Sequence, residues 1–187
     1  MLTSYQYYKK ITIDSSKIDS DLSHFPLPIP LGTSVGMSDQ DVTDVFDEVG
    51  SDYLKIAVTM DDGETHLYVE VEQWDATNER ALLWVSRDTW SVLSSSDTEI
   101  YLYFDSTADN NTAYIGTSGN RTEVWSNDFA AVLTMAQDPS GGTDSIVDST
   151  GNGHHGTPNG GMDSNDLVDG LIGKALDFDG GDDFLEV

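Results

Sequence analysis

The chain has 187 residues, of which 34 are Asp or Glu and 8 are Lys or Arg, giving a net charge of −26. This excess of negative charge disfavours binding to nucleic acid or to anionic membranes, because both require cations to neutralise phosphates. The absence of cysteine excludes disulfides, thiolate metal sites and a cysteine nucleophile. No apolar run approaches the ~18 residues that a membrane-spanning helix needs, so we expect no membrane insertion.

The N-terminal part predicts two strands and one short helix. Residues Lys10–Ile13 alternate between polar and apolar side chains, as a strand does. The apolar segment Phe25–Leu31 contains three prolines, which predicts an edge strand or an extended polyproline-like segment because proline cannot donate to a β-ladder. Residues Ser38–Glu48 predict a short helix capped by Ser38, with acidic residues favourable near its N-terminus.

The middle of the chain predicts a β-hairpin. Residues Tyr53–Met60 and Thr65–Trp74 both alternate, and Asp61–Gly63 between them is a turn signal. In the second strand the period of two places one group of residues on the aliphatic face: Leu67, Val69 and Val71. The same period places Tyr68, Glu70, Glu72 and Trp74 on the opposite face.

Short strands continue toward the C-terminus. Residues Arg80–Ser86 and Thr98–Phe104 predict strands, and in the second of these Tyr101 and Tyr103 face away from the aliphatic side chains. Further strands are expected at Phe129–Met135, 175–178 and 184–187. Residues Asp105–Arg121 predict a long functional loop or a pair of turns. Short strands separated by Gly, Asp and Asn turns favour an all-β fold, an antiparallel β-sandwich of jelly-roll type.

Residues 1–135 are expected to form the first domain, and their landmarks resemble a known group of proteins. In order, these landmarks are Tyr8–Ile13, Phe25–Leu31, Glu72–Asp75, Ala81–Val85, Asp97–Phe104 and Val124–Trp125. The set resembles an uncharacterised all-β domain family that precedes laminin-G-like or concanavalin-A-like jelly-roll lectin domains in microbial and phage surface proteins. This resemblance implies a protein that is extracellular, on a cell surface or on a virion, although the first ten residues contain no signal peptide.

Residues 136–187 resemble the truncated start of a laminin-G-like jelly roll. The matching residues are Asp148–Gly153, His155–Thr157, Gly173–Gly180 and Asp182–Val187. The family's ligand loops fall mostly beyond such a start, so none of its binding residues can be assigned here. The segment could pack on the first domain, pair with another chain or be loosely held. Unpaired strand edges favour a homo-oligomer.

The resemblances imply recognition of a polysaccharide or cell-surface glycan, usually without catalysis. Sugar rings stack on exposed aromatic side chains, while Asp and Asn side chains bond their hydroxyls. We predict the carbohydrate-binding residues to be Trp90, Trp125, Trp74 and Tyr103, although large aromatic side chains also commonly fill cores.

Acidic loops suggest a structural calcium ion, because Ca²⁺ prefers six to eight oxygen ligands. We predict the metal ligands to be Asp105, Asp109 and Asn110, and the segment Asp177–Asp183 is a second loop of this kind. Simple turn chemistry is the alternative explanation for Asp and Asn in both loops.

Two other functions remain open beside a lectin-like carbohydrate-binding module. One is a structural or protein-interaction module of a surface or virion protein. The other is a glycoside hydrolase, since Glu70 and Glu72 share a strand face about 7 Å apart, within the range that glycosidase carboxylates need. Two solvated glutamates on a strand are the commoner arrangement, so we expect no enzymatic activity.

Overall fold

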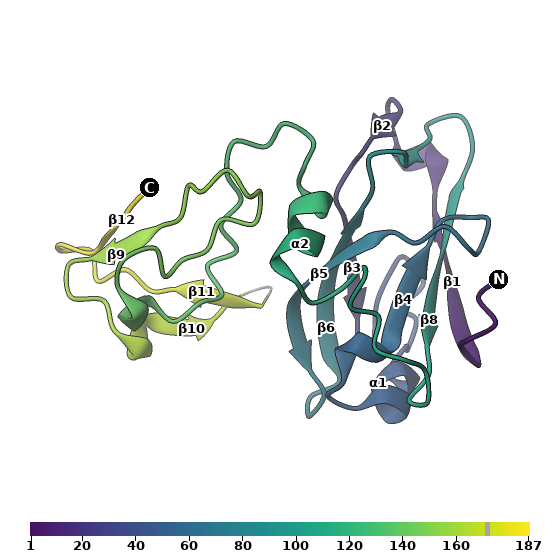
Figure 1. The fold of residues 1–187 in the computed structure, drawn as a ribbon, viewed down its shortest axis with the longest axis horizontal. Helices are drawn as coiled ribbons and strands as arrows, with labels where there is room; N and C mark the ends of the chain where they lie inside the picture. The colour runs from purple at the N-terminus through teal and green to yellow at the C-terminus, as the bar shows by residue number, and fades with distance from the viewer. Residues whose placement is uncertain (171–172) are drawn as a thin grey trace. The chain divides into compact units, whose positions relative to one another are not determined.

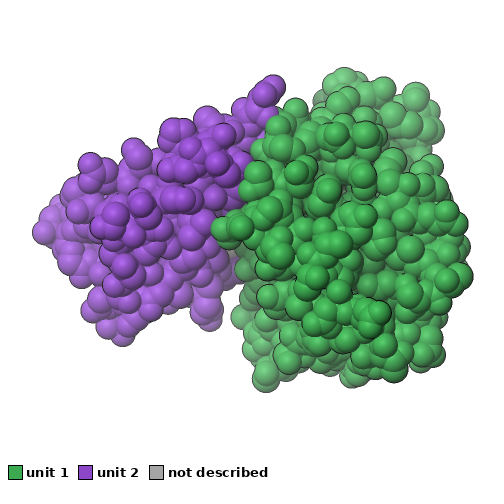
Figure 2. All heavy atoms as spheres, viewed as in Figure 1, with its two compact units in different colours: residues 1–127 green, residues 128–187 purple. Residues whose placement is uncertain are grey.

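The computed structural model describes residues 1–170 and 173–187. The chain divides into two compact units, unit 1 (Met1–Asn127) and unit 2 (Asp128–Val187) (Figure 2). Antiparallel strands are the main regular structure and helices are few, which confirms the all-β class. Among the described residues, no helix combines the length and the apolar character needed to cross a membrane.

Unit 1 contains two three-stranded sheets (Figure 1). The first has the order β1-β8-β4, and its strands are β1 (Tyr7–Ile13), β8 (Thr98–Phe104) and β4 (Ile56–Thr59). The second has the order β3-β6-β5, and its strands are β3 (Leu27–Leu31), β6 (Arg80–Ser86) and β5 (Tyr68–Asp75). A separate pair joins β2 (Leu22–Ser23) to β7 (Ser91–Val92). The prediction that the proline-containing strand lies at an edge is confirmed by the position of β3.

Both sheets contribute their aliphatic faces to one hydrophobic core. The fully buried side chains of this core include Ile56, Val58, Val69, Leu83, Val85 and Ile100. On β8 the aliphatic residues point inward and Tyr101 lies on the other side, as the alternation predicts. The core therefore fixes which side of each strand remains available for other contacts.

The predicted hairpin around Asp61–Gly63 is only partly correct. The turn forms, because the Met60 amide donates to the Thr65 carbonyl over 2.9 Å and Thr59 bridges His66. Beyond this point the chain leaves the first sheet, and β5 pairs with β6 in the second sheet instead of with β4. The segment Tyr53–Lys55, expected to begin the strand, is a 3₁₀ helix (η2).

A β-bulge in β5 reverses the predicted direction of Trp74. The register between β5 and β6 shifts between Val71 and Gln73, so that one residue of β5, Glu72, has no partner opposite it. An extra residue changes the alternation that follows it. Trp74 consequently packs against the core, where its ring lies 4.9 Å from that of Phe46.

Two α-helices belong to unit 1, and one of them was not predicted. Helix α1 (Asp44–Val49) begins after Thr43, so Ser38 is not its cap. Helix α2 (Ser118–Val124) lies at the end of the segment expected to be a loop, and it packs against β5 and β6. A capping box starts it, in which the Thr117 and Asn120 side chains each bond the other's backbone amide. A 3₁₀ helix, η1 (Ser15–Lys17), follows β1.

Unit 2 is built from short paired strands. Strand β10 (Leu167–Asp169) pairs with β11 (Lys174–Leu176), and β12 (Phe184–Glu186) pairs with β9 (Thr157–Asn159). The two predicted C-terminal strands are thus present, β11 slightly earlier in the sequence than expected. Two 3₁₀ helices, η3 (Pro139–Gly141) and η4 (Ser164–Asp166), complete the unit.

The strand expected at Phe129–Met135 is absent. This segment is irregular, and its one ladder contact is a bridge between Leu133 and Asp148. Because Leu133 pairs within unit 2, the boundary between the units falls after Asn127, eight residues before the expected end at 135.

Unit 2 is organised around a buried carboxylate, that of Asp148, which is 2% exposed. It accepts hydrogen bonds from the backbone amides of Val132, Thr150 and His154, and from the Thr150 hydroxyl. Burial alone would raise the pKa of Asp148, but these hydrogen bonds outweigh it and lower the pKa to about 2. Three segments of the unit are therefore joined through one side chain.

We predict that Asp148→Asn destabilises unit 2 by about 2–3 kcal/mol, because the amide would direct a donor at backbone donors that are already buried. Hydrogen exchange of the full chain should show faster exchange at Val132, Thr150 and His154. The control is Asp144→Asn, since the Asp144 side chain is exposed. Equal protection in the two variants would contradict the prediction.

A pH dependence follows from the same carboxylate. The pKa of Asp148 is lower in the folded chain than the ~3.9 of an unfolded aspartate, so ionisation stabilises the folded unit. This stabilisation is complete above about pH 4 and is lost as the pH falls toward about 2. As the pH falls over that range, the protection of unit 2 amides relative to an unfolded chain should decrease in the wild type and change less in Asp148→Asn.

Candidate functional site

Two of the four predicted sugar-binding rings lie inside unit 1. Trp90 is 2% exposed and belongs to the hydrophobic core, although it follows a turn. Tyr103 is 1% exposed, and its hydroxyl donates to the Gly63 carbonyl over 3.1 Å. The turn at Gly63 and the sulfur of Met1, 3.0 Å from the hydroxyl, cover this ring. Neither side chain presents a face on which a sugar could stack.

The other two predicted rings are also engaged by the protein. The indole of Trp74 donates to the Gly50 carbonyl over 2.9 Å, on the core side of β5. Trp125 is 6% exposed and its indole donates to Glu70. The four predicted rings therefore do not form an exposed stacking surface. The core and the β5 bulge hold Trp90 and Trp74, whereas Tyr103 is covered on the outer side of its sheet.

Glu70 and Glu72, the pair considered for a glycosidase, each accept a hydrogen bond from an indole. Trp125 donates to Glu70 and Trp84 donates to Glu72, and the two indole rings lie 5.2 Å apart. Burial raises the pKa of Glu72, and the hydrogen bond from Trp84 opposes this effect. Glu70 thus attaches Trp125, the residue that follows α2, to β5, and Glu72 joins β5 to Trp84 of β6, so both carboxylates have a structural role.

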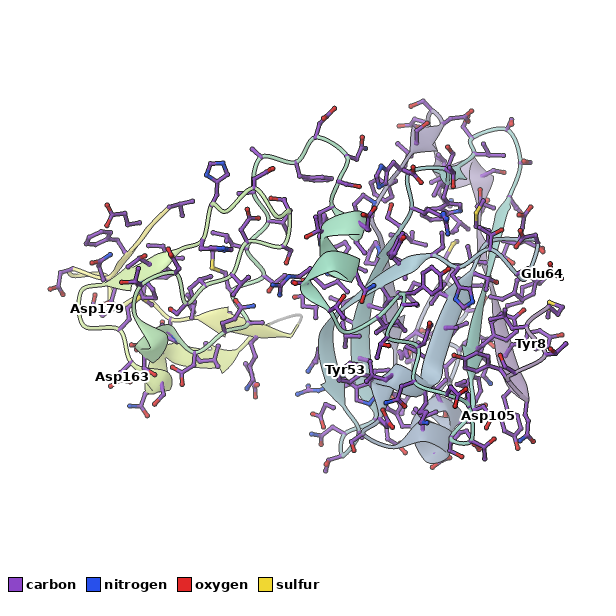
Figure 3. The ribbon with its side chains drawn as sticks, viewed as in Figure 1. Tyr8, Tyr53, Glu64, Asp105, Asp163 and Asp179 are labelled. Atoms are coloured by element: carbon purple, nitrogen blue, oxygen red, sulfur yellow. The ribbon has the colours of Figure 1, made fainter. Side chains whose placement is uncertain are left out.

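One exposed aromatic ring, that of Tyr8, lies on the outer side of the first sheet, beside the partly buried Tyr101. We call this surface the tyrosine face; it comprises Tyr8, Lys10 and Thr12 of β1 with Glu99, Tyr101 and Tyr103 of β8. Tyr8 is 53% exposed and lies at the outer margin of unit 1 (Figure 3). Its ring is nevertheless held in place, 5.7 Å from the ring of Tyr101 and 5.8 Å from that of Tyr103.

Polar groups stand beside these rings. Lys10 is the cross-strand partner of Tyr101, and its ammonium donates to Glu99 over 2.8 Å. Glu99 pairs across the ladder with the exposed Thr12. The tyrosine face thus combines a fixed aromatic surface with an ammonium, a carboxylate and a hydroxyl within one patch of two adjacent strands.

The sequence contained a signal for this surface. From Tyr8 the chain alternates Tyr8, Lys10 and Thr12 with residues of the other side, and the same period groups Glu99, Tyr101 and Tyr103. What the sequence did not show is that β1 and β8 are neighbours in the same sheet, which brings the two sets together.

The predicted calcium ligands are not presented as one set. The Asp105 carboxylate is 1% exposed and accepts from the Gln6 amide at 2.9 Å and from the Thr107 amide and hydroxyl at 2.7 Å. The hydrogen bonds from Thr107 are the main reason that the pKa of Asp105 is lowered. Asp109 and Asn110 are exposed. The carboxylate of Asp105 thus serves the turn, as simple turn chemistry predicts.

The second acidic loop does gather carboxylates. Asp179, Asp182 and Asp183 offer oxygens that all lie within 4.8 Å of one another, and Asp179 is labelled in Figure 3. One Asp179 oxygen also accepts from the backbone amides of Gly181, Asp182 and Asp183. Three carboxylates supply part of the six to eight oxygens that Ca²⁺ takes, so calcium remains a prediction for this loop.

In comparisons with known proteins, no family model, curated protein or solved structure matches the chain. The two family resemblances therefore remain predictions.

We predict that Trp84→Phe raises the pKa of Glu72 further, because it removes the indole donor that stabilises the charged carboxylate. Carboxyl carbon NMR of the full chain during a pH titration measures this. Trp74→Phe is the control, since the indole of Trp74 bonds Gly50 instead. A Glu72 pKa that is unchanged in Trp84→Phe would show that the hydrogen bond does not control the titration.

Proposed function

We propose that the chain is a non-catalytic, lectin-like carbohydrate-binding module whose glycan stacks on Tyr8 of the tyrosine face. One observation carries the proposal: Tyr8 is 53% exposed, yet its ring is fixed against Tyr101 and Tyr103. A ring that is already ordered loses little conformational entropy when a ligand covers it.

The neighbouring polar groups suit sugar hydroxyls. Lys10 can donate to a hydroxyl oxygen, Glu99 can accept from a hydroxyl, and Thr12 can do either. The ion pair between Lys10 and Glu99 holds both groups beside the aromatic surface. A single exposed ring on an open face desolvates little area, so binding would be weak.

Charge favours an uncharged glycan over an anionic one. Sulfated or uronate-rich polysaccharides would meet a chain of net charge −26, and this repulsion is strongest at low ionic strength. The class of ligand that fits is a neutral polysaccharide or cell-surface glycan.

The finer architecture and setting belong to the same proposal. Two sheets that share one core support a β-sandwich, and we propose the jelly-roll type predicted from the sequence. A recognition module of this kind fits an extracellular, cell-surface or virion protein. A calcium ion would stabilise a loop and take no part in chemistry.

We expect Tyr8→Ala to weaken glycan binding at least tenfold, because it removes the stacking ring, whereas Tyr8→Phe should keep most of the affinity. Tyr7→Ala is the matched control: Tyr7 is 46% exposed but stacks on Phe104, on the other side of β1. A glycan array followed by titration calorimetry makes the measurement. The proposal fails if the array is silent, or if Tyr8→Ala and Tyr7→Ala bind alike.

For calcium, we expect titration calorimetry to detect binding that is lost in Asp182→Asn and kept in Asp109→Asn. The reason is that the carboxylates converge in the second acidic loop and not in the first. The reverse pattern would place the calcium site in the loop containing Asp105. If the wild type gives no heat of binding, neither loop binds calcium. Because Asp182 and Tyr8 lie in different units, chelation should leave glycan binding unchanged.

The second candidate function is a structural or interaction module. The observation that favours it is an uncovered strand in unit 1, which is also the basis of the inference below. If the glycan array shows no binding and the chain self-associates in solution, this second function would be supported in place of the first.

A further inference from the structure

Three of the four outer edges of the two main sheets in unit 1 are protected. Strand β3 carries Pro28 and Pro30, which have no amide to donate. Strand β5 is covered by residues 114–115, since the Val69 amide donates to the Tyr114 carbonyl over 2.9 Å. Strand β4 is covered by the chain that follows it, where the Leu67 amide donates to the Val58 carbonyl over 2.8 Å.

The fourth edge, that of β1, has none of these protections. β1 pairs with β8 without a register shift from Tyr7 to Ile13, and contains no proline. Among the described residues, no backbone hydrogen bond joins its other edge to a further segment. Lysines often block such edges, but here Lys9 pairs with Asp44 at 2.6 Å and Lys10 with Glu99 at 2.8 Å.

The register shows which backbone groups face this edge. The Asp105 amide donates to the Lys55 carbonyl beside β4, so odd-numbered residues of β8 direct their backbone groups to β4 and even-numbered residues direct theirs to β1. In the ladder of β1 with β8, even residues of β8 stand opposite odd residues of β1. The amides and carbonyls of Tyr8, Lys10 and Thr12 therefore point to the free edge.

Local charge distinguishes this edge from the rest of the chain. Residues 1–13 contain two lysines and no carboxylate, although the chain has 34 acidic residues. Two copies that meet at β1 thus bring no acidic residue of either strand into direct contact. Exposed Tyr7 and Tyr8 add apolar surface on both sides of the strand.

We propose that the β1 edge pairs antiparallel with the β1 edge of a second copy of this chain. A two-fold axis near Lys10 would place Tyr8 opposite Thr12 of the second copy, an aromatic and β-branched pair that stabilises antiparallel ladders. It would also place the two Lys10 side chains opposite each other, each paired with Glu99 of its own copy, which adds to the weakness of the contact. One strand pair buries less surface than a stable dimer needs, so the association is weak. It strengthens with salt, because screening reduces the repulsion between two chains of net charge −26.

The decisive variants lie at one position. Thr12→Pro removes an amide that faces the free edge and leaves the ladder with β8 intact, whereas Thr12→Val keeps that amide. Sedimentation equilibrium of the full chain in about 0.05 M and about 1 M NaCl measures the association. We expect the wild type and Thr12→Val to dimerise more tightly at high salt, and Thr12→Pro to remain monomeric with an unchanged circular dichroism spectrum.

A second measurement uses the absence of native cysteine. With the axis near Lys10, Lys10→Cys should form disulfide-linked dimers on mild oxidation, and a mixture of Tyr8→Cys and Thr12→Cys should form mixed dimers. Tyr8→Cys alone or Thr12→Cys alone should not, because four strand residues place the two identical thiols about 14 Å apart. Ser96→Cys is the control, since Ser96 is exposed in the bend before β8 and is not a residue of the β1 edge.

Three results would overturn the proposal. The first is a monomeric wild type at high salt, which would leave the edge to a strand of another protein. The second is a Thr12→Pro variant that associates as the wild type does. The third is a cross-linking yield for Lys10→Cys no higher than that of Ser96→Cys.

Discussion

The hydrophobic core shared by the two sheets of unit 1 is the constraint on which the rest of that unit depends. It takes one side of every long strand, so ligand contacts can use only the other side or the strand edges. For this reason, the number of aromatic residues alone does not predict which of them can bind a sugar. Trp90 and Trp74 serve the core, whereas Tyr8, on a strand at the margin of its sheet, keeps an exposed ring.

Strands whose alternation is regular could be predicted from the sequence, and β6 and β8 have the predicted bounds. Two features could not, because their causes are tertiary. Helix α2 consists of polar residues typical of turns, and its packing against β5 and β6 supports it. The bulge at Glu72 leaves no mark in the alternation, yet it decides where Trp74 points. The tyrosine face could not be predicted either, because the sequence does not show that β1 and β8 are neighbours.

Unit 2 is stabilised in a different way from unit 1. Its described part has few large buried apolar side chains, chiefly Ile146 and Met162, and its strands have three residues each. A core of this size cannot hold long irregular segments together. The buried Asp148 carboxylate connects those segments through backbone amides. The Asp148–Gly153 motif, recognised in the sequence as a family resemblance, thus has a physical explanation that needs no ligand.

The even residues of strand β1 contribute to two potential functions, one through their side chains and the other through their backbone groups. The odd residues Tyr7, Lys9, Ile11 and Ile13 direct their backbone groups to β8. The even residues Tyr8, Lys10 and Thr12 place their side chains on the tyrosine face and their backbone groups at the free edge. Sugar binding uses the side chains on the tyrosine face. Strand pairing uses the backbone groups at the free edge and the contact between Tyr8 and Thr12, so the two proposals are compatible. In an antiparallel pair related by a two-fold axis, opposite residues point to the same side of the sheet. Two tyrosine faces would then lie on one continuous surface. A polysaccharide that spans both would bind with higher affinity than one that contacts a single weak site, because the second contact is made at a high effective concentration.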